Sequence, residues 1–88
     1  MWHVYLIRTK MGQLYTGVTQ DVLRRFKEHQ KEGRKGAKYL KGKKPLKLVF
    51  HKKIGSHSQA LKTEAQIKKW PKKKKEALIN NEIPLEDL

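Results

Sequence analysis

A tyrosine, a glycine, an arginine and a histidine lie within one short stretch of the chain, namely Tyr15, Gly17, Arg25 and His29. An arginine guanidinium can hold a phosphate through two parallel hydrogen bonds, and the free N–H groups at a helix start also attract anions. The stretch therefore predicts a phosphate-binding site. The simpler alternative is a surface strand followed by an ordinary basic helix.

A predicted strand and a predicted helix position these side chains. Leu14 to Thr19 is rich in β-branched and aromatic residues, which is typical of a strand. A helix follows, with Thr19 or Asp21 as its N-cap. The apolar residues of its buried stripe are Val22, Leu23 and Phe26. At about 100° per residue, Arg25 and His29 lie one turn apart at the edge of this stripe.

A second tyrosine joins the first if the chain begins with a β-hairpin. Trp2 to Arg8 has the composition of a strand and is followed by a glycine-containing loop. If the loop comprises residues 9–13, Tyr5 lies opposite Gly17 and on the same face of the sheet as Tyr15. A loop shorter by one residue would place the two tyrosines on opposite faces.

The middle of the chain is basic and interrupted by glycines, over residues 31–44. Ala37 to Leu40 is expected to form one helical turn, in a segment that is either a solvated loop or a contact to DNA. A third strand is predicted from Leu46 to His51. A turn follows, and its Ser58 is expected to cap the next helix.

Gln59 to Trp70 is predicted to be a helix with a carboxylate near the middle of its apolar stripe. The apolar residues of this stripe are Ala60, Leu61, Ala65 and Ile67. The carboxylate is that of Glu64, and its burial is costly unless it is paired or bound to a cation. Two interpretations follow, an ion pair with Lys68 and a metal-binding carboxylate.

The last predicted helix starts after Pro71 and extends from Lys72 to Ile79, with Leu78 and Ile79 packing inward. Its four consecutive lysines, Lys72 to Lys75, are typical of a solvated face. The same lysines would also suit a contact to a polyanion.

The composition points to nucleic acid as the first partner to consider. The 88 residues include 22 Lys and Arg against 8 acidic residues, a formal net charge of +14. Such a chain attracts polyanions, whereas a membrane surface would require a broad apolar helix face that the sequence lacks. The absence of cysteine excludes disulfides and thiolate metal sites. With no apolar run long enough for a membrane span and no signal-peptide pattern, a cytoplasmic monomer is the expectation.

The candidate site residues lie in a particular order and at particular spacings along the predicted elements β-β-α-β-α-α. They are Val4, Tyr5, Tyr15, Gly17, Arg25, His29 and Glu64. This set resembles the GIY-YIG endonuclease superfamily, and nearly the whole chain looks like its small bacterial YhbQ-like members, which are similar to the UvrC N-terminal domain. Two departures are visible. His3 and Val4 stand where the first motif has its glycine and its isoleucine, so that only Tyr5 matches there, and the C-terminal asparagine of the family has only Asn80 and Asn81 as candidates.

The resemblance implies an α/β fold of the α+β type, a small three-stranded antiparallel sheet flanked by helices, as one domain over residues 1–88. It implies hydrolysis of a phosphodiester to a 5′-phosphate and a 3′-hydroxyl, with one Mg²⁺ or Mn²⁺ per site held by Glu64. The residues to which it gives catalytic roles are Tyr5, Tyr15, Arg25, His29 and Glu64, and either of the two tyrosines would take the proton of the attacking water. Val4 and Gly17 would be structural. The cations expected to contact nucleic acid are Arg24, Lys38, Lys72, Lys73, Lys74 and Lys75.

Three functions are compatible with the sequence. The first is a metal-dependent DNA endonuclease of repair or recombination, acting on branched or damaged DNA. The second is a basic module of the same fold that binds DNA or RNA without turnover. The third, a ribosome-associated basic protein, rests on charge alone and explains neither the two tyrosines nor Glu64.

Overall fold

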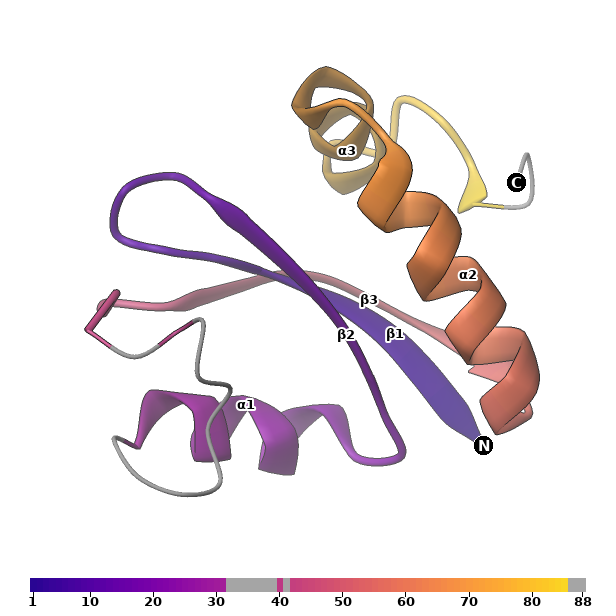
Figure 1. The fold of residues 1–88 in the computed structure, drawn as a ribbon, viewed down its shortest axis with the longest axis horizontal. Coiled ribbons are helices and arrows are strands. Elements are labelled where there is room, and N and C mark those ends of the chain that lie inside the picture. The colour runs from indigo at the N-terminus through magenta and orange to yellow at the C-terminus, as the bar shows by residue number, and fades with distance from the viewer. Residues whose placement is uncertain (32–39, 41, 86–88) are drawn as a thin grey trace.

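The computed structural model describes residues 1–31, 40 and 42–85 and contains one three-stranded antiparallel sheet, with strands in the order β2-β1-β3 (Figure 1). The strands are β1, Trp2–Arg8; β2, Leu14–Thr19; and β3, Lys47–Gly55. The first two have the bounds that the sequence predicted. The predicted helical turn at residues 37–40 lies outside the described residues, except for Leu40.

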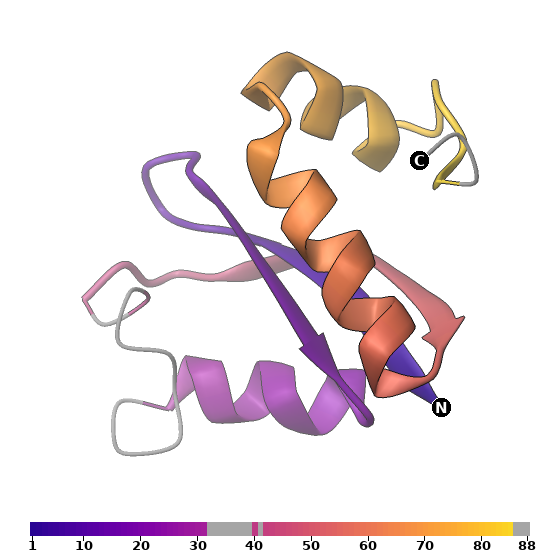
Figure 2. The ribbon, with the colours of Figure 1, turned by 45° about the vertical axis from the view of Figure 1, so that its right-hand side comes forward.

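The helices are α1, Val22–Gln30; α2, His57–Lys69; and α3, Lys72–Ile79. The order β-β-α-β-α-α is therefore confirmed, and with it the α+β class. In Figures 1 and 2, α1 lies at the bottom of the molecule, α3 lies at the top, and α2 runs beside the strands between them. No helix among the described residues combines the length and the apolar character that a membrane span requires.

The hairpin has the predicted register. Tyr5 is paired with Gly17, and Ile7 with Tyr15. Because side chains alternate between the two faces of a strand, this register places both tyrosines on the same face. The prediction of a shared face is thus confirmed.

Each face of the central strand β1 is covered by its own group of side chains. Val4 and Leu6 belong to a core with Ile67 of α2 and Leu78 of α3. The alternate residues, among them Tyr5, belong to a second core against which side chains of α1 pack. Fully burying an aliphatic side chain contributes about 1.5–3 kcal/mol to the stability of the fold. The buried side chains on both faces of β1 therefore hold in place the sheet that carries the tyrosines.

The boundary between β3 and α2 differs from the prediction. The strand runs four residues beyond His51, to Gly55, because its backbone pairs with β1 as far as Trp2. The N-cap of α2 is then Ser56 and not Ser58. The Ser56 hydroxyl accepts from the backbone N–H of Gln59, whose side chain in turn accepts from the Ser56 N–H, a capping box.

Two predicted helix stripes are wrong in part. Leu23 is 68% exposed and Leu61 is 42% exposed, and Ala65 is exposed as well. Both helices rest on a sheet of only three strands, so each buries a narrower stripe than its apolar residues offer. The buried members of α2 are Ala60 and Ile67.

The C-terminal helix is tied to the sheet by an ion pair. Both terminal nitrogens of Arg8 donate to the Glu76 carboxylate at 2.6 Å. The hydrogen bonds from Arg8 lower the pKa of Glu76. Leu78 is buried, as predicted, and Ile79 packs against the core that contains it. Pro71 is the N-cap of α3, so the helix begins at Lys72.

Candidate active site

Three aromatic rings meet on the tyrosine face of the sheet. Tyr5 is 2% exposed, and its hydroxyl oxygen lies 2.8 Å from Nε2 of His29, a buried residue of α1. The ring centroid of Tyr15 lies 6.4 Å from that of Tyr5 and 5.5 Å from that of His29. The hairpin and α1 therefore bring together side chains far apart in the sequence.

Gly17 makes room for the Tyr5 side chain. A Cβ atom at Gly17 would clash with the Tyr5 hydroxyl oxygen and lie only 2.5 Å from its ring carbon Cζ. The phenol thus crosses directly over the backbone of β2. The group that approaches Gly17 is the tyrosine of the neighbouring strand.

Replacing Gly17 by alanine is expected to destabilise the fold and to displace the Tyr5 hydroxyl. Overpacking of a buried site typically costs about 1–3 kcal/mol, which urea unfolding would measure. In a Tyr5→Leu background the same change should cost much less, because the clashing atoms are gone. An equal cost in both backgrounds would show that Tyr5 is not the group that excludes a side chain here.

Arg25 lies beside Tyr5 and is paired with an acidic residue of its own helix. Its Nη1 donates to Glu28 at 3.0 Å. Burial alone lowers the pKa of Arg25, but hydrogen bonds to Glu28 and Tyr5 together raise it. The same carboxylate lies 3.5 Å from Arg24. Sequence reasoning missed Glu28, although its spacing of four residues from Arg24 was a readable signal.

The donor and acceptor roles within this group follow from chemistry. A guanidinium can only donate, so the Tyr5 oxygen accepts from Arg25. In the tautomer of neutral His29 that carries its proton on Nδ1, the phenol donates its one proton to Nε2. The pKa of His29 is lowered to about 4, mainly by burial and also by the charge of Arg25, while the charge of Glu28 acts in the opposite direction. His29 is therefore neutral near pH 7 and able to accept a proton at Nε2.

Tyr5 is a weak acid in this environment. Its pKa is raised to about 12, mainly by burial and also by the neighbouring Tyr15, while the hydrogen bond and charge of Arg25 act in the opposite direction. Tyr5 therefore carries its proton near pH 7. Any role as a proton acceptor requires that its own proton leave in the same step, and His29 is the neighbour that can take it.

The stability of the fold is expected to fall as the pH falls from about 6.5 to about 4, in part because of His29. Its folded-state pKa of about 4 lies below the ordinary value of 6.5, so in this interval only the unfolded chain binds the proton. Urea unfolding at several pH values would measure the slope. His29→Gln should have a shallower slope than wild type, and an unchanged slope would contradict the burial of a neutral imidazole.

Glu64 approaches the site from α2. Its negative charge acts on Tyr5, whose pKa it raises, and its side chain is 18% exposed. The carboxylate lies 3.5 Å from Nζ of Lys68, whose side chain is 56% exposed. The predicted ion pair is thus present. Its lysine is largely in solvent, where such pairs contribute at most about 1 kcal/mol, so the carboxylate can exchange this partner at little cost.

The described residues fit a metal that arrives with the substrate better than a resident metal centre. They contain no group of three or more acidic or histidine side chains that could hold an ion. Mg²⁺ is commonly bound through one or two carboxylates together with water and substrate phosphates. Glu64 supplies one hard oxygen donor of this kind beside Tyr5.

The cations predicted to contact nucleic acid do not form one cluster. Arg24, whose side chain is 73% exposed, lies on α1. Lys72, Lys73 and Lys74 are exposed on α3, and Lys75 is half-buried. Figures 1 and 2 place these two helices at opposite ends of the molecule. Lys38 lies outside the described residues.

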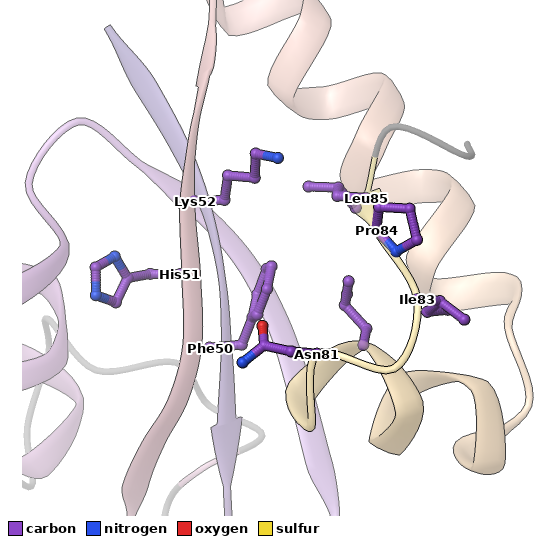
Figure 3. Close-up of a pocket in the computed structure, with 8 residues that line it drawn as sticks. Phe50, His51, Lys52, Asn81, Ile83, Pro84 and Leu85 are labelled. Carbon is purple, nitrogen blue, oxygen red and sulfur yellow. The ribbon is translucent and has the colours of Figure 1, made fainter.

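Asn81 lies away from the tyrosines. It has a positive φ of 59° and lines a hollow of about 260 Å³ between β3 and the segment after α3. Figure 3 shows it beside Phe50, with Ile83 and Leu85 on the facing segment. Asn80 is the exposed C-cap of α3. Asn81 is therefore a turn residue that follows α3.

The three-stranded antiparallel sheet and the order of strands and helices are those of a GIY-YIG domain. The model of the GIY-YIG catalytic domain matches residues 1–77, so the chain belongs to this nuclease family. Val4, the residue before the first motif tyrosine, is fully buried, and His3 at the glycine position is half-buried.

The chain is similar to several UPF0213 proteins. That of Yersinia enterocolitica is 51% identical over 82 residues, which is 93% of this chain and 82% of the relative. That of Yersinia pestis strain Pestoides F is 52% identical over 79 residues, or 90% and 81%. The solution NMR structure of the UPF0213 protein from Bacillus halodurans is 40% identical, with a TM-score of 0.57 over 91% of this chain and 84% of that one.

Proposed function

We propose that this protein is a divalent-metal-dependent DNA endonuclease that acts in repair or recombination, as a monomer in the cytoplasm. The observation that carries the proposal is the hydrogen-bonded group of Arg25, Tyr5 and His29 on one face of the sheet. It combines a permanent positive charge with a path for a proton. Hydrolysis of a phosphodiester requires both.

Arg25 would bind the scissile phosphate. Its guanidinium is charged at every accessible pH and is held in place by Glu28 and Tyr5. As water attacks, negative charge grows on the phosphoryl oxygens, and a fixed cation there lowers the barrier. Because this charge is larger in the transition state than in the substrate, the arginine acts mainly on the rate.

Tyr5 and His29 would move the proton of the attacking water. The water oxygen forms its bond to phosphorus while one water proton passes to the Tyr5 oxygen and the Tyr5 proton passes to Nε2 of His29. The bond from phosphorus to the 3′ oxygen breaks, leaving a 5′-phosphate and a 3′-hydroxyl after that oxygen takes a proton from solvent. Proton transfer by positioned groups typically contributes about 10²–10⁴-fold.

Glu64 would hold one Mg²⁺ or Mn²⁺ ion together with phosphate oxygens of the substrate. When bound, the metal supplies Lewis-acid stabilisation of the phosphate and the leaving oxygen. Glu64 could release Lys68 for this role at little cost, because that lysine is largely exposed. Tyr15 would pack against His29 and keep its ring oriented.

A panel of DNA substrates tests the proposal. The purified chain would be incubated with duplex, flap, fork and junction DNA, each with Mg²⁺, with Mn²⁺ and with EDTA, and with a structured RNA as a further substrate. We expect metal-dependent cutting of at least one DNA, with 5′-phosphate ends. If no substrate is cut with any divalent metal, the proposal is wrong.

One observation favours a second candidate, a basic module that binds DNA or RNA without cutting it. Glu64 already has a partner in Lys68, as a purely structural carboxylate would. The net charge of +14 is sufficient for binding on its own. This candidate predicts affinity without turnover in the same panel.

A further inference from the structure

A groove lies next to Arg25, at the end of the sheet where the chain begins. It has a volume of about 270 Å³ and is bounded by Trp2 from β1, by Thr19, Gln20 and Asp21 from the connection into α1, and by side chains of α1. Figures 1 and 2 show the N-terminus beside the end of β2 and the start of α2. None of the catalytic roles proposed above uses this groove beyond Arg25.

Trp2 is an aromatic wall that is held in place. Its ring stacks on that of His57 in the first turn of α2, with centroids 3.9 Å apart and planes inclined by 20°. The residue is half-buried although it is the second in the chain. An indole held by a stacked ring can receive a planar ligand without first losing rotational freedom.

The charges around the groove are balanced. The groove is lined by the two arginines Arg24 and Arg25 and by two acidic residues, Asp21 and Glu28, and Glu28 is paired with both arginines. A site for a second phosphate would have an excess of positive charge. Balanced charges, an indole and the exposed amide of Gln20 suit a neutral planar ligand with hydrogen-bonding edges.

The size of the groove also limits the ligand. Pockets for drug-sized molecules have volumes of about 300–1,000 Å³, and this groove falls just below that range. One nucleobase is a planar ligand of suitable size. Arg25 lines the groove and, in the proposed function, holds the scissile phosphate, so the base would belong to a neighbouring nucleotide.

We propose that the groove binds one unpaired nucleobase of the nucleotide next to the scissile phosphate, against Trp2. The proposal rests on the proposed function only for the phosphate that Arg25 holds. Drawing a paired base out of a duplex is costly, whereas an unpaired base is free to enter. The substrate class that follows is DNA with an unpaired nucleotide at the cut, such as a flap or a mismatch.

Fluorescence and affinity test the groove without any turnover. Trp70→Phe leaves Trp2 as the sole tryptophan, and binding would be measured in EDTA with a flap DNA and a fully paired duplex of equal length. We expect the flap to change Trp2 emission strongly and the duplex to change it little. Loss of base–aromatic stacking by Trp2→Ala should weaken flap binding by roughly 5–150-fold.

Matched variants separate stacking from folding. Trp2→Ala should leave duplex affinity within about twofold, and Trp2→Phe should retain most of the affinity for the flap, since a phenyl ring also stacks. His57→Ala removes the ring behind Trp2 and should weaken flap binding to an intermediate extent. If Trp2→Ala unfolds the chain, the emission change and the Trp2→Phe variant still test the proposal.

The outcome is independent of cleavage. Unchanged Trp2 emission at saturating flap DNA, or equal weakening of flap and duplex binding by Trp2→Ala, would overturn the base site and leave the endonuclease proposal intact. A chain that shows the flap-specific emission change but cuts nothing would retain the base site and refute the endonuclease.

Discussion

Replacing Arg25 by alanine is expected to reduce DNA cutting at least about 10²–10³-fold, the loss typical of removing a group that stabilises charge in the transition state. The guanidinium contacts the Tyr5 hydroxyl and is held by Glu28, so its removal takes away both the phosphate charge and the donor to Tyr5. Initial rates at saturating DNA would measure the effect.

Lys27→Ala is the matched control for Arg25→Ala. Lys27 is exposed on the same helix, and its loss removes the same charge and leaves the site intact. We expect this variant to cut at nearly the wild-type rate. Equal losses in the two variants would mean that α1 contributes only net charge, and the catalytic role of Arg25 would then be wrong.

Replacing Tyr5 by phenylalanine should reduce cutting by about 10²–10⁴-fold, because the ring remains and the proton path through its hydroxyl is lost. The hydroxyl bonds to Nε2 of His29, and burial raises the pKa of Tyr5 to about 12, so the phenol works only together with this partner. Cutting rates measured between pH 6 and 9 would give the size of the loss and would show whether the pH dependence of the rate changes.

Tyr15→Phe is the internal comparison for Tyr5→Phe. Tyr15 contacts both Tyr5 and His29 through its ring, which phenylalanine preserves. We therefore expect a smaller loss than for Tyr5→Phe. If Tyr15→Phe is inactive and Tyr5→Phe is active, the roles proposed for the two tyrosines must be exchanged.

The register of the hairpin could be predicted from the sequence because the length of its loop fixes it. Once the loop comprised residues 9–13, the twofold alternation of a strand determined the partner and the face of the residues from His3 to Arg8 and from Leu14 to Thr19. This register alone brought Tyr5, Tyr15 and Gly17 together. The helix spacing then placed Arg25 and His29 on the same side.

Other features depend on tertiary contacts that local patterns do not contain. The end of β3 is set by backbone pairing with Trp2, whereas the two consecutive lysines after His51 gave no reason to extend the strand. The exposure of Leu23 and Leu61 reflects the small area of the sheet beneath each helix.

In the candidate site, too, some contacts follow from local spacing and others depend on the fold. Local spacing suffices to pair Glu28 with Arg24, but only the fold shows that Glu28 also holds Arg25 and that Trp2 lies beside both. The depressed pKa of His29 likewise arises from burial under the sheet, which no sequence pattern records.

The most direct test of the endonuclease proposal is a comparison of wild type and Glu64→Gln in three assays on the same preparations: metal-dependent nicking, DNA affinity and melting temperature. Glutamine keeps the size of the side chain and removes the charge that would hold the metal. The control is Glu82→Gln, which removes an exposed carboxylate near the C-terminal turn.

We expect Glu64→Gln to lose at least about 10²-fold in nicking rate, with its melting temperature unchanged and its DNA affinity equal or higher, while Glu82→Gln nicks like wild type. If Glu64 serves only to pair with Lys68, the variant would instead melt at a lower temperature and nick in proportion to its folded fraction. That second result would contradict a role for Glu64 in catalysis.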